Sequence, residues 1–337
     1  DEVKASFRDS AAITTFGFLT TWVATVLLCT FFLDLPLLPS LFIGATLGGT
    51  SSAVVVGLVK KIGVQPRTST TLIIESAESD IFTLAIPLSI LTLMITGELA
   101  AYSVVSQFIS SIIISLIMGI GGAFLWSFII NKIPALKKTK FSTPAFLLVI
   151  YGITEYLHFS GPLTALSFGI AIGNLEYFEP KLLEKYVPNQ RIILPKAERS
   201  FFGQLVFLLR TFFFVFIGIS IKIDRLDWLI WGAAITAVLF LVRIVLVKFV
   251  IRKNTPLLDK AVMSMMIPKG LGAAVIATLP LQQGNPYGEI IQAICFSVIL
   301  FSTLYCVVLF FLVNQKLTLP IYGLIYGKDR PIDKEVN

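Results

Sequence analysis

Long apolar runs dominate the chain and are separated by short polar connections. Charge-free runs such as 10–33, 35–59, 99–131 and 290–315 reach or exceed the roughly 20 residues that cross the hydrocarbon core of a bilayer as a helix. They are continuously apolar, whereas an outer-membrane barrel needs polar residues at every second position. Helices are then the form that satisfies the backbone in lipid. The pattern predicts ten membrane segments, at about 11–33, 38–59, 70–96, 103–131, 143–158, 161–174, 200–221, 227–251, 258–283 and 287–313.

Composition supports an all-α polytopic membrane protein. Of the 337 residues, 56% are hydrophobic and only 14% are charged, against roughly 25% charged in soluble domains. Cys29, Cys295 and Cys306 lie inside apolar runs without metal-ligand spacing, so they are interpreted as packing residues. We therefore expect neither an enzyme, nor catalytic residues, nor a cofactor.

The basic residues predict the orientation of the chain. Lys and Arg number 27 against 20 Asp and Glu, a net charge of +7. When the connections are assigned to alternating sides, Lys222 and Arg225 are the only basic residues of one side, so the other side and the C-terminus are expected in the cytoplasm. The charge thus reflects topology and anionic lipid, not nucleic acid. The cations inside segments are Arg210, Arg243, Lys248 and Lys269.

Three acids lie within two turns of the segment 70–96. A helical period places Ser76 and Asp80 on one face, Glu75 and Ser79 on an adjacent face, and Glu78 roughly opposite Asp80. Charges at membrane depth are costly unless they are paired or lie in a cavity. Either all three acids neutralise buried cations as structural pairs, or at least one is free to titrate and to bind a cation with the neighbouring hydroxyls.

Two segments carry small and polar residues that indicate helices broken near the midplane. These stretches are 44–52 and 267–272. A pair of broken helices is a sequence pointer to a transporter binding site, although small residues also serve close helix packing. The two stretches lie in the second and the ninth of the ten predicted segments. Because this offset of seven segments is odd, the two segments cross the membrane in opposite directions, as an inverted repeat requires. When the other segments are paired in the register set by this offset, about three helices are expected upstream of residue 1.

The expected organisation follows from that register. Residues 1–102 form the C-terminal part of a first inverted repeat, 103–142 a linking helix and cytoplasmic loop, 143–313 the second repeat, and 314–337 a cytoplasmic tail. The connection 175–200 is predicted to be a cytoplasmic linker that lies partly at the membrane interface.

Several motifs together carry a family resemblance. In chain order they are Gly44–Val56 (GATLGGTSSAVVV), Glu75–Asp80 (ESAESD), Tyr151–Asn174 (YGITEYLHFSGPLTALSFGIAIGN), Phe212–Ser220 (FFFVFIGIS), Arg243, and Pro268–Gly270 (PKG). This series resembles the monovalent cation:proton antiporter superfamily over essentially the whole chain. Within it, the Ser79–Asp80 pair is similar to the motif of the electroneutral sodium/proton exchangers.

The resemblance implies a secondary transporter that exchanges a monovalent cation for H⁺ by alternating access. Na⁺ is expected first, with Li⁺ or K⁺ as alternatives, and a homodimer in a prokaryotic plasma membrane is implied. By this resemblance, Asp80 is the carboxylate that holds the cation or the proton. The same binding group includes Ser76, Ser79 and Thr50. Glu75 forms a structural ion pair with Arg243. The residues of the broken helices are Gly48, Gly49, Ser51, Pro268 and Gly270.

The sequence departs from the family pattern at three positions. Ser79 replaces the usual Asn, Glu78 stands where an apolar residue is ordinary, and Lys269 stands where Arg is more frequent. Glu78 either pairs with Lys269 or is an additional titrating group. His158, near Glu155, is interpreted as an interfacial packing residue.

Three other functions remain as alternatives. The first is a sodium-coupled symporter of an organic anion, held at the broken-helix N-termini. The second is a channel-like cation pathway, and the third is a membrane scaffold without transport. The buried acids argue against the scaffold because a charge at membrane depth is expensive.

Overall fold

The computed structural model describes residues 2–59, 61–97, 101–133, 136, 141–157, 159, 161–173, 196–221, 225–252 and 254–327. Within these ranges every regular element is a helix, as the apolar runs predict. Contacts divide the chain into two compact units, one of residues 1–97 with 213–337 and the other of residues 98–212.

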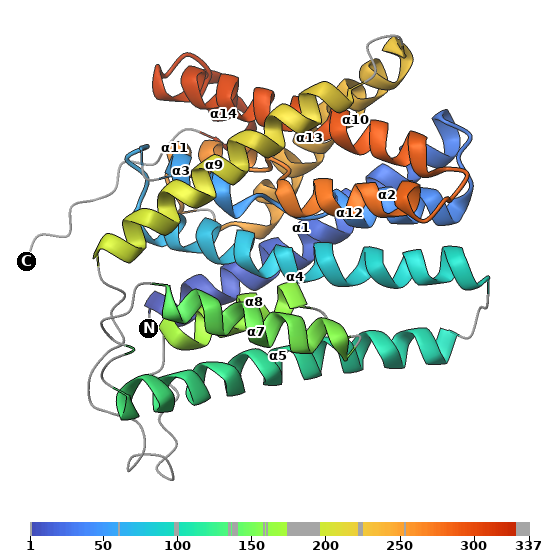
Figure 1. The fold of residues 1–337 in the computed structure, drawn as a ribbon. Helices are drawn as coiled ribbons and strands as arrows, with labels where there is room; N and C mark the ends of the chain where they lie inside the picture. Colours follow the sequence, from blue (N-terminus) through green and yellow to red (C-terminus); the bar gives the residue numbers. More distant parts are fainter. Residues whose placement is uncertain are drawn as a thin grey trace, which may run out of the picture. The chain divides into compact units, whose positions relative to one another are not determined.

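The first unit contains nine of the described helices (Figure 1). Here α1 packs against α2, α4 and α10, while α13 packs against α10 and α12. The bounds are α1 Glu2–Phe32, α2 Leu37–Thr46, α3 Ser52–Val59, α4 Pro66–Thr96, α10 Leu226–Val250, α11 Leu257–Met265, α12 Leu271–Gln282, α13 Gly288–Asn314 and α14 Leu319–Tyr326.

The second unit is built from α5 (Ala101–Lys132), α7 (Ser142–Tyr156) and α8 (Gly161–Gly173). A Cβ at Gly119 of α5 would lie 1.8 Å from Ser167 Oγ of α8, so the two helices approach closely. Small residues at helix contacts allow such an approach in membranes. The boundary between the units falls within α9 (Lys196–Ser220), after Phe212.

Six of the described helices are long and apolar enough to cross a membrane. Ten segments were expected, and the difference has a physical cause. Segments 38–59 and 258–283 are each broken into two half-helices, and segments 143–158 and 161–174 form α7 and α8, of 15 and 13 residues. The six candidate spans are Asp9–Phe32, Pro66–Ile95, Ile113–Lys132, Gly203–Ser220, Leu226–Val250 and Gly288–Asn314.

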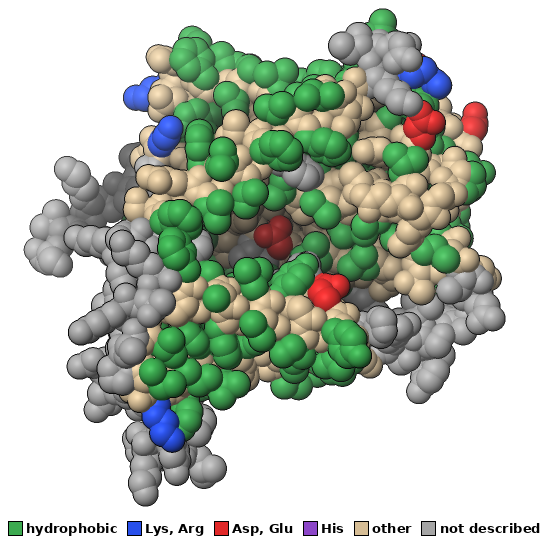
Figure 2. Space-filling view, in the orientation of Figure 1, with side chains coloured by type: hydrophobic (Ala, Val, Ile, Leu, Met, Phe, Trp, Pro, Cys, Tyr) green, Lys and Arg blue, Asp and Glu red, His purple; other side chains and the backbone are tan. Residues whose placement is uncertain are grey.

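Large apolar side chains lie on the surface, and Figure 2 shows them spread over one face with only scattered charged groups. Phe249 is 81% exposed and Ile219 is 80% exposed. Extensive apolar exposure marks a surface that is covered by a partner or by lipid. Together with the six long apolar helices, it describes an integral membrane protein.

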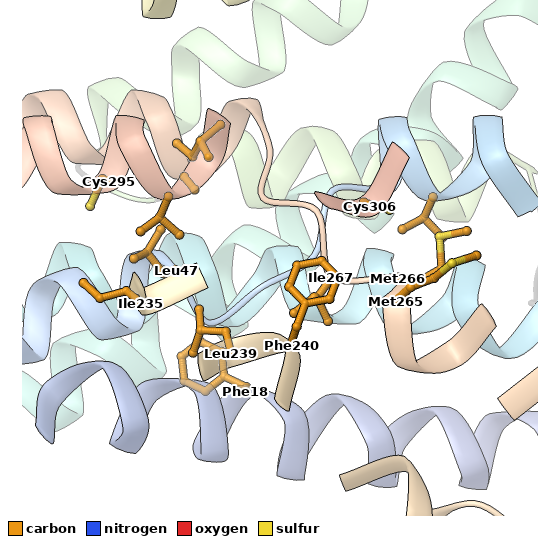
Figure 3. Close-up of a cluster of buried hydrophobic side chains, with 14 of the residues drawn as sticks. Phe18, Leu47, Ile235, Leu239, Phe240, Met265, Met266, Ile267, Cys295 and Cys306 are labelled. Atoms are coloured by element: carbon orange, nitrogen blue, oxygen red, sulfur yellow. The ribbon is translucent and has the colours of Figure 1, made fainter. Parts of the chain in front are cut away.

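The core of the first unit surrounds two non-helical segments. Leu47 lies between α2 and α3, and Ile267 lies between α11 and α12, both almost fully buried. Figure 3 shows them among other buried apolar side chains, with Leu239 and Phe240 contributed by α10. Irregular backbone at membrane depth is tolerated only where protein or a water-filled cavity surrounds it. The breaks predicted at 44–52 and 267–272 therefore have the packing they need.

The candidate span Asp9–Phe32 agrees with the segment predicted at about 11–33, and α1 extends it to Glu2. α14 lies within 314–337, whose assignment as a cytoplasmic tail stays a prediction. Other predicted features lie outside the described part of the chain. His158, Lys222 and most of the connection 175–200 fall outside the described residues, as does the side chain of Arg210.

Candidate functional site

The two helix breaks cross each other inside the first unit. The Ser51 amide donates a 2.7 Å hydrogen bond to the Pro268 carbonyl, and Lys269 Nζ donates a 3.0 Å hydrogen bond to the Gly49 carbonyl. A broken helix leaves backbone groups without helical partners, and here each break satisfies groups of the other. A Cβ at Gly270 would lie 2.7 Å from Ser51 Oγ, so this crossing favours glycine.

The first break is also fixed to α4. The Thr50 amide donates to Ser79 Oγ at 3.0 Å, and the two hydroxyl oxygens lie 3.3 Å apart. A Cβ at Gly49 would lie 2.0 Å from Thr83 Oγ1. The structure thus brings together Thr50 and Ser79, two of the predicted binding residues.

Glu75 and Arg243 form a buried two-point ion pair. Arg243 Nη1 lies 2.7 Å from Glu75 Oε1, and Nη2 donates to Oε2 at 2.7 Å. Both side chains are at most 4% exposed. Arg243 Nε also donates to the Met263 carbonyl at 3.0 Å, so one guanidinium joins α4, α10 and α11. Such bidentate geometry is the strong form of the charged hydrogen bond.

Asp80 has a different environment from Glu75. It is half-buried, and its Oδ2 accepts a hydrogen bond of 3.5 Å from Ser52 Oγ at the start of α3. Asp80 forms no ion pair with any residue in the described ranges. Ser76 Oγ donates to the Ile73 carbonyl at 2.8 Å, so its hydroxyl proton is directed to the backbone of α4.

Glu78 is held by α1. Its Oε2 accepts hydrogen bonds from Ser10 Oγ at 2.9 Å and from Thr14 Oγ1 at 2.8 Å. The structure does not bring Glu78 and Lys269 together as an ion pair within its described part. Glu78 and Asp80 take their partners from different helices, which agrees with the helical period that places them on opposite faces of α4.

Sequence reasoning missed several polar partners of these side chains. Ser10, Thr14 and Ser302, which accepts the Lys269 amide at 3.0 Å, lie in apolar runs where hydroxyls commonly bond their own helix. Asp259 was also missed. It is 2% exposed and accepts from the Gln65 amide and Thr68 Oγ1 at the start of α4. Asp259 lies in the first turn of α11, where a carboxylate is favoured by the helix dipole, and this position was the available signal.

Among the three acids of α4, Asp80 is the one least engaged by the described residues. Glu75 is neutralised by Arg243, and Glu78 is engaged by two hydroxyls. Within the described ranges Asp80 accepts one long hydrogen bond, and it lies on α4, which contacts the crossing. Carboxylate and hydroxyl oxygens are ligands suited to hard cations.

Comparisons with known proteins agree with this architecture. The sequence model of the family described as "Sodium/hydrogen exchanger, transmembrane" matches residues 1–315. Two solved structures of the sodium proton antiporter MjNhaP1 from Methanocaldococcus jannaschii share the fold. One, determined at pH 8, has a TM-score of 0.61 at 20% identity and covers 96% of this chain and 79% of that chain. The other, from electron microscopy, has a TM-score of 0.66 at 18% identity and covers 99% and 80%.

Curated relatives are similar to part of the chain. The K(+)/H(+) antiporter NhaP2 of Shewanella oneidensis is 28% identical over 178 residues, which is 50% of this chain and 31% of the relative. The protein of that name from Shewanella baltica is 28% identical over 182 residues with the same coverage. The chain thus spans about a third of the length of these relatives.

The resemblance predicted from the motifs is confirmed, and so is the all-α antiporter fold. Because the family match covers nearly the whole chain, the chain belongs to the sodium/hydrogen exchanger family of transmembrane proteins.

Proposed function

We propose that this chain forms the transport core of an antiporter that exchanges a monovalent cation for H⁺ at Asp80. Na⁺ is the first expectation, and Li⁺ and K⁺ are the alternatives. The sodium proton antiporter that shares the fold supports Na⁺, whereas the K(+)/H(+) antiporters among the relatives support K⁺. The proposal requires no catalytic residue and no cofactor.

The observation that carries the proposal is the unequal engagement of the three acids of α4. Arg243 holds both oxygens of Glu75, and two hydroxyls hold Glu78. Asp80 accepts one hydrogen bond of 3.5 Å and has no ion-pair partner in the described ranges. A half-buried carboxylate without a fixed counter-ion is the group that gains most from a cation or a proton.

Competition at Asp80 couples the two fluxes. The site faces one side at a time, and the carboxylate carries a cation in one direction and a proton in the other. Thr50, Ser76 and Ser79 belong to the proposed binding group, with the Thr50–Ser79 contact fixing the first break against α4. The Glu75–Arg243 pair has a structural role, because a salt bridge that is already satisfied gains little from an incoming ion.

The setting of the transporter is proposed from the family resemblance and the sequence pattern. The resemblance implies a homodimer in the plasma membrane of a prokaryote, and the distribution of basic residues implies that the basic connections and the C-terminus lie in the cytoplasm. The inverted repeat relates the broken helices 38–59 and 258–283, and the hydrogen bond from Ser51 to Pro268 is consistent with their crossing.

Flux in reconstituted liposomes tests the proposal. Full-length protein is placed in vesicles of phosphatidylethanolamine and phosphatidylglycerol with an internal pH dye, a proton gradient is imposed, and Na⁺, Li⁺ or K⁺ is added. Cation-driven proton movement that is lost in Asp80→Asn supports the antiporter and identifies the ion. Cation flux without proton movement supports a channel, and flux only with an organic anion supports a symporter.

A further inference from the structure

One hydroxyl of α14 joins two helices of the candidate site. Tyr326 Oη donates to the Ile244 carbonyl of α10 at 3.0 Å and lies 2.6 Å from Ser264 Oγ of α11. α14 follows the last candidate membrane span, Gly288–Asn314. Tyr326 is the last residue of this short helix, so a side chain outside the spans reaches the junction of α10 and α11.

Each partner of Tyr326 is the next residue in the sequence after one of the two residues that form the buried Arg243–Met263 hydrogen bond. Ile244 follows Arg243, and Ser264 follows Met263, whose carbonyl accepts from Arg243 Nε at 3.0 Å. Tyr326 therefore bridges α10 and α11 one residue beyond the point where Arg243 bridges them.

The position of this junction matters because α11 ends there. The Ile267 amide, which would bond the Met263 carbonyl in a continuing helix, bonds the Met265 carbonyl at 2.9 Å instead. The Met263 carbonyl then lies at the negative end of α11, and Arg243 satisfies it. Any shift of α11 along α10 changes that contact, and the same guanidinium holds Glu75 of α4.

We propose that Tyr326 is a positioning residue for the ion site. Its hydroxyl fixes α10 against α11, so that Arg243 stays in place to hold Glu75. The contact between Arg243 and Glu75 in turn fixes the register of α4, the helix that bears Asp80. This inference rests on the proposed function for its transport readout. It assigns to the segment after the last span a part in setting cation affinity.

The hydroxyl is suited to this task at neutral pH. Burial raises the pKa of Tyr326 above its ordinary value, against smaller opposing effects from the Ser264 hydrogen bond and the Arg243 charge. Because an unperturbed tyrosine already titrates near about 10, the hydroxyl stays protonated and remains a donor.

Tyr322 supplies a matched control. It lies one turn earlier on α14, is 5% exposed, and its ring stacks on Tyr326 with centroids 6.3 Å apart. Among the described residues, the hydrogen bonds that join α14 to α10 and α11 come from the Tyr326 hydroxyl and not from that of Tyr322. Tyr322→Phe and Tyr326→Phe therefore remove the same atom from the same helix, but only the second removes the bridge.

The experiment measures full-length wild type, Tyr326→Phe, Tyr322→Phe, Ser264→Ala and the Tyr326→Phe/Ser264→Ala double variant. In liposomes, the cation concentration for half-maximal exchange and the maximal rate are separated. In detergent, hydrogen exchange of the peptide covering 257–270 and the melting temperature are recorded. This exchange readout does not depend on transport, so a lack of antiport in wild type would refute the proposed function while the positioning claim is still tested.

Loss of the Tyr326 hydroxyl, with its contacts to the Ile244 carbonyl and to Ser264 Oγ, predicts that Tyr326→Phe raises the half-maximal cation concentration by about two- to tenfold. The maximal rate of cation–proton exchange changes less, and hydrogen exchange of the peptide 257–270 becomes faster. Tyr322→Phe resembles wild type in each of these measurements. The double variant should lose less cation affinity than the sum of the two single variants, because both single changes break the Tyr326–Ser264 contact, although Ser264→Ala also removes a hydrogen bond to the Lys260 carbonyl.

Three results would overturn the inference. The first is an equal effect of the two tyrosine variants, and the second is additive effects of Tyr326→Phe and Ser264→Ala. The third is a lower melting temperature of Tyr326→Phe with unchanged cation affinity and unchanged hydrogen exchange.

Discussion

The amide of Ser51 donates a 2.7 Å hydrogen bond to the carbonyl of Pro268, so the two broken helices are joined by their own backbones. The residues on either side extend the contact. Gly49 supplies a carbonyl to Lys269 Nζ, and Gly270 passes close to the Ser51 side chain. The crossing is therefore held by direct hydrogen bonds between the two breaks, and the Thr50 amide connects it to Ser79 of α4, the helix that bears the three carboxylates.

Gly49→Ala tests the closeness of this packing. The new Cβ would lie 2.0 Å from Thr83 Oγ1, so we expect a loss of about 1–3 kcal/mol in unfolding free energy, as in overpacked cores. Gly57→Ala in the adjoining α3 is the control, because nothing lies within 4 Å of its Cβ. Thermal unfolding in detergent compares them. Similar melting of both variants would contradict the packing described here, and Thr83→Ala should partly rescue Gly49→Ala.

The buried ion pair predicts strong coupling between Glu75 and Arg243. Removing either partner leaves a charge without its counter-ion at a site at most 4% exposed, which costs about 3–5 kcal/mol. The Glu75→Ala/Arg243→Ala double variant should lose much less than the sum of the single variants. Denaturant titration in detergent measures the cycle. Additive losses would show that the pair is not the stabilising contact.

Much of this architecture could be predicted from the sequence. Lipid demands long apolar helices, so the charge-free runs located most spans, and clusters of small residues located both breaks. The Glu75–Arg243 contact joins residues far apart in the chain, and no local pattern indicates it. Only the family resemblance suggested it.

Other features had no usable signal. α14, Leu319–Tyr326, is too short to show a helical period against its apolar neighbours. Ser10 and Thr14 bond Glu78, but hydroxyls in helices commonly bond their own backbone, so their partners depend on tertiary packing. For the same reason, the sequence does not decide whether Glu78 pairs with Lys269 or titrates.

Glu78→Gln separates the charge of this residue from its hydrogen bonds. The amide oxygen can still accept from Ser10 and Thr14. Because no buried donor is left unsatisfied, we expect exchange within about threefold of wild type and unchanged folding. Glu78→Leu leaves the Ser10 hydroxyl without its acceptor, whereas Thr14 Oγ1 keeps the Ser10 carbonyl at 2.8 Å, and stability should fall by about 1–3 kcal/mol. Liposome flux and thermal unfolding record the two effects. Loss of exchange in Glu78→Gln would instead make Glu78 a second titrating group.

Proton competition at Asp80 gives a pH dependence with a definite sign. Below the pH at which the carboxyl is half protonated, each unit of acidification should raise the cation concentration for half-maximal exchange by about tenfold, because the protonated carboxyl must lose its proton first. Above that pH the value should level off. Initial rates of cation-driven flux over a range of pH provide the test, and a pH-independent half-maximal concentration would argue for separate cation and proton sites.

The most direct test of the account is proton release on cation binding. Purified full-length protein in weakly buffered detergent solution, near the pH of half-protonation, is mixed with Na⁺ or K⁺ while a dye reports the pH. The account predicts that wild type releases protons in proportion to bound cation, and that Asp80→Asn releases none while Glu78→Gln behaves as wild type. Undiminished release from Asp80→Asn would contradict the claim that cation and proton compete for this carboxylate.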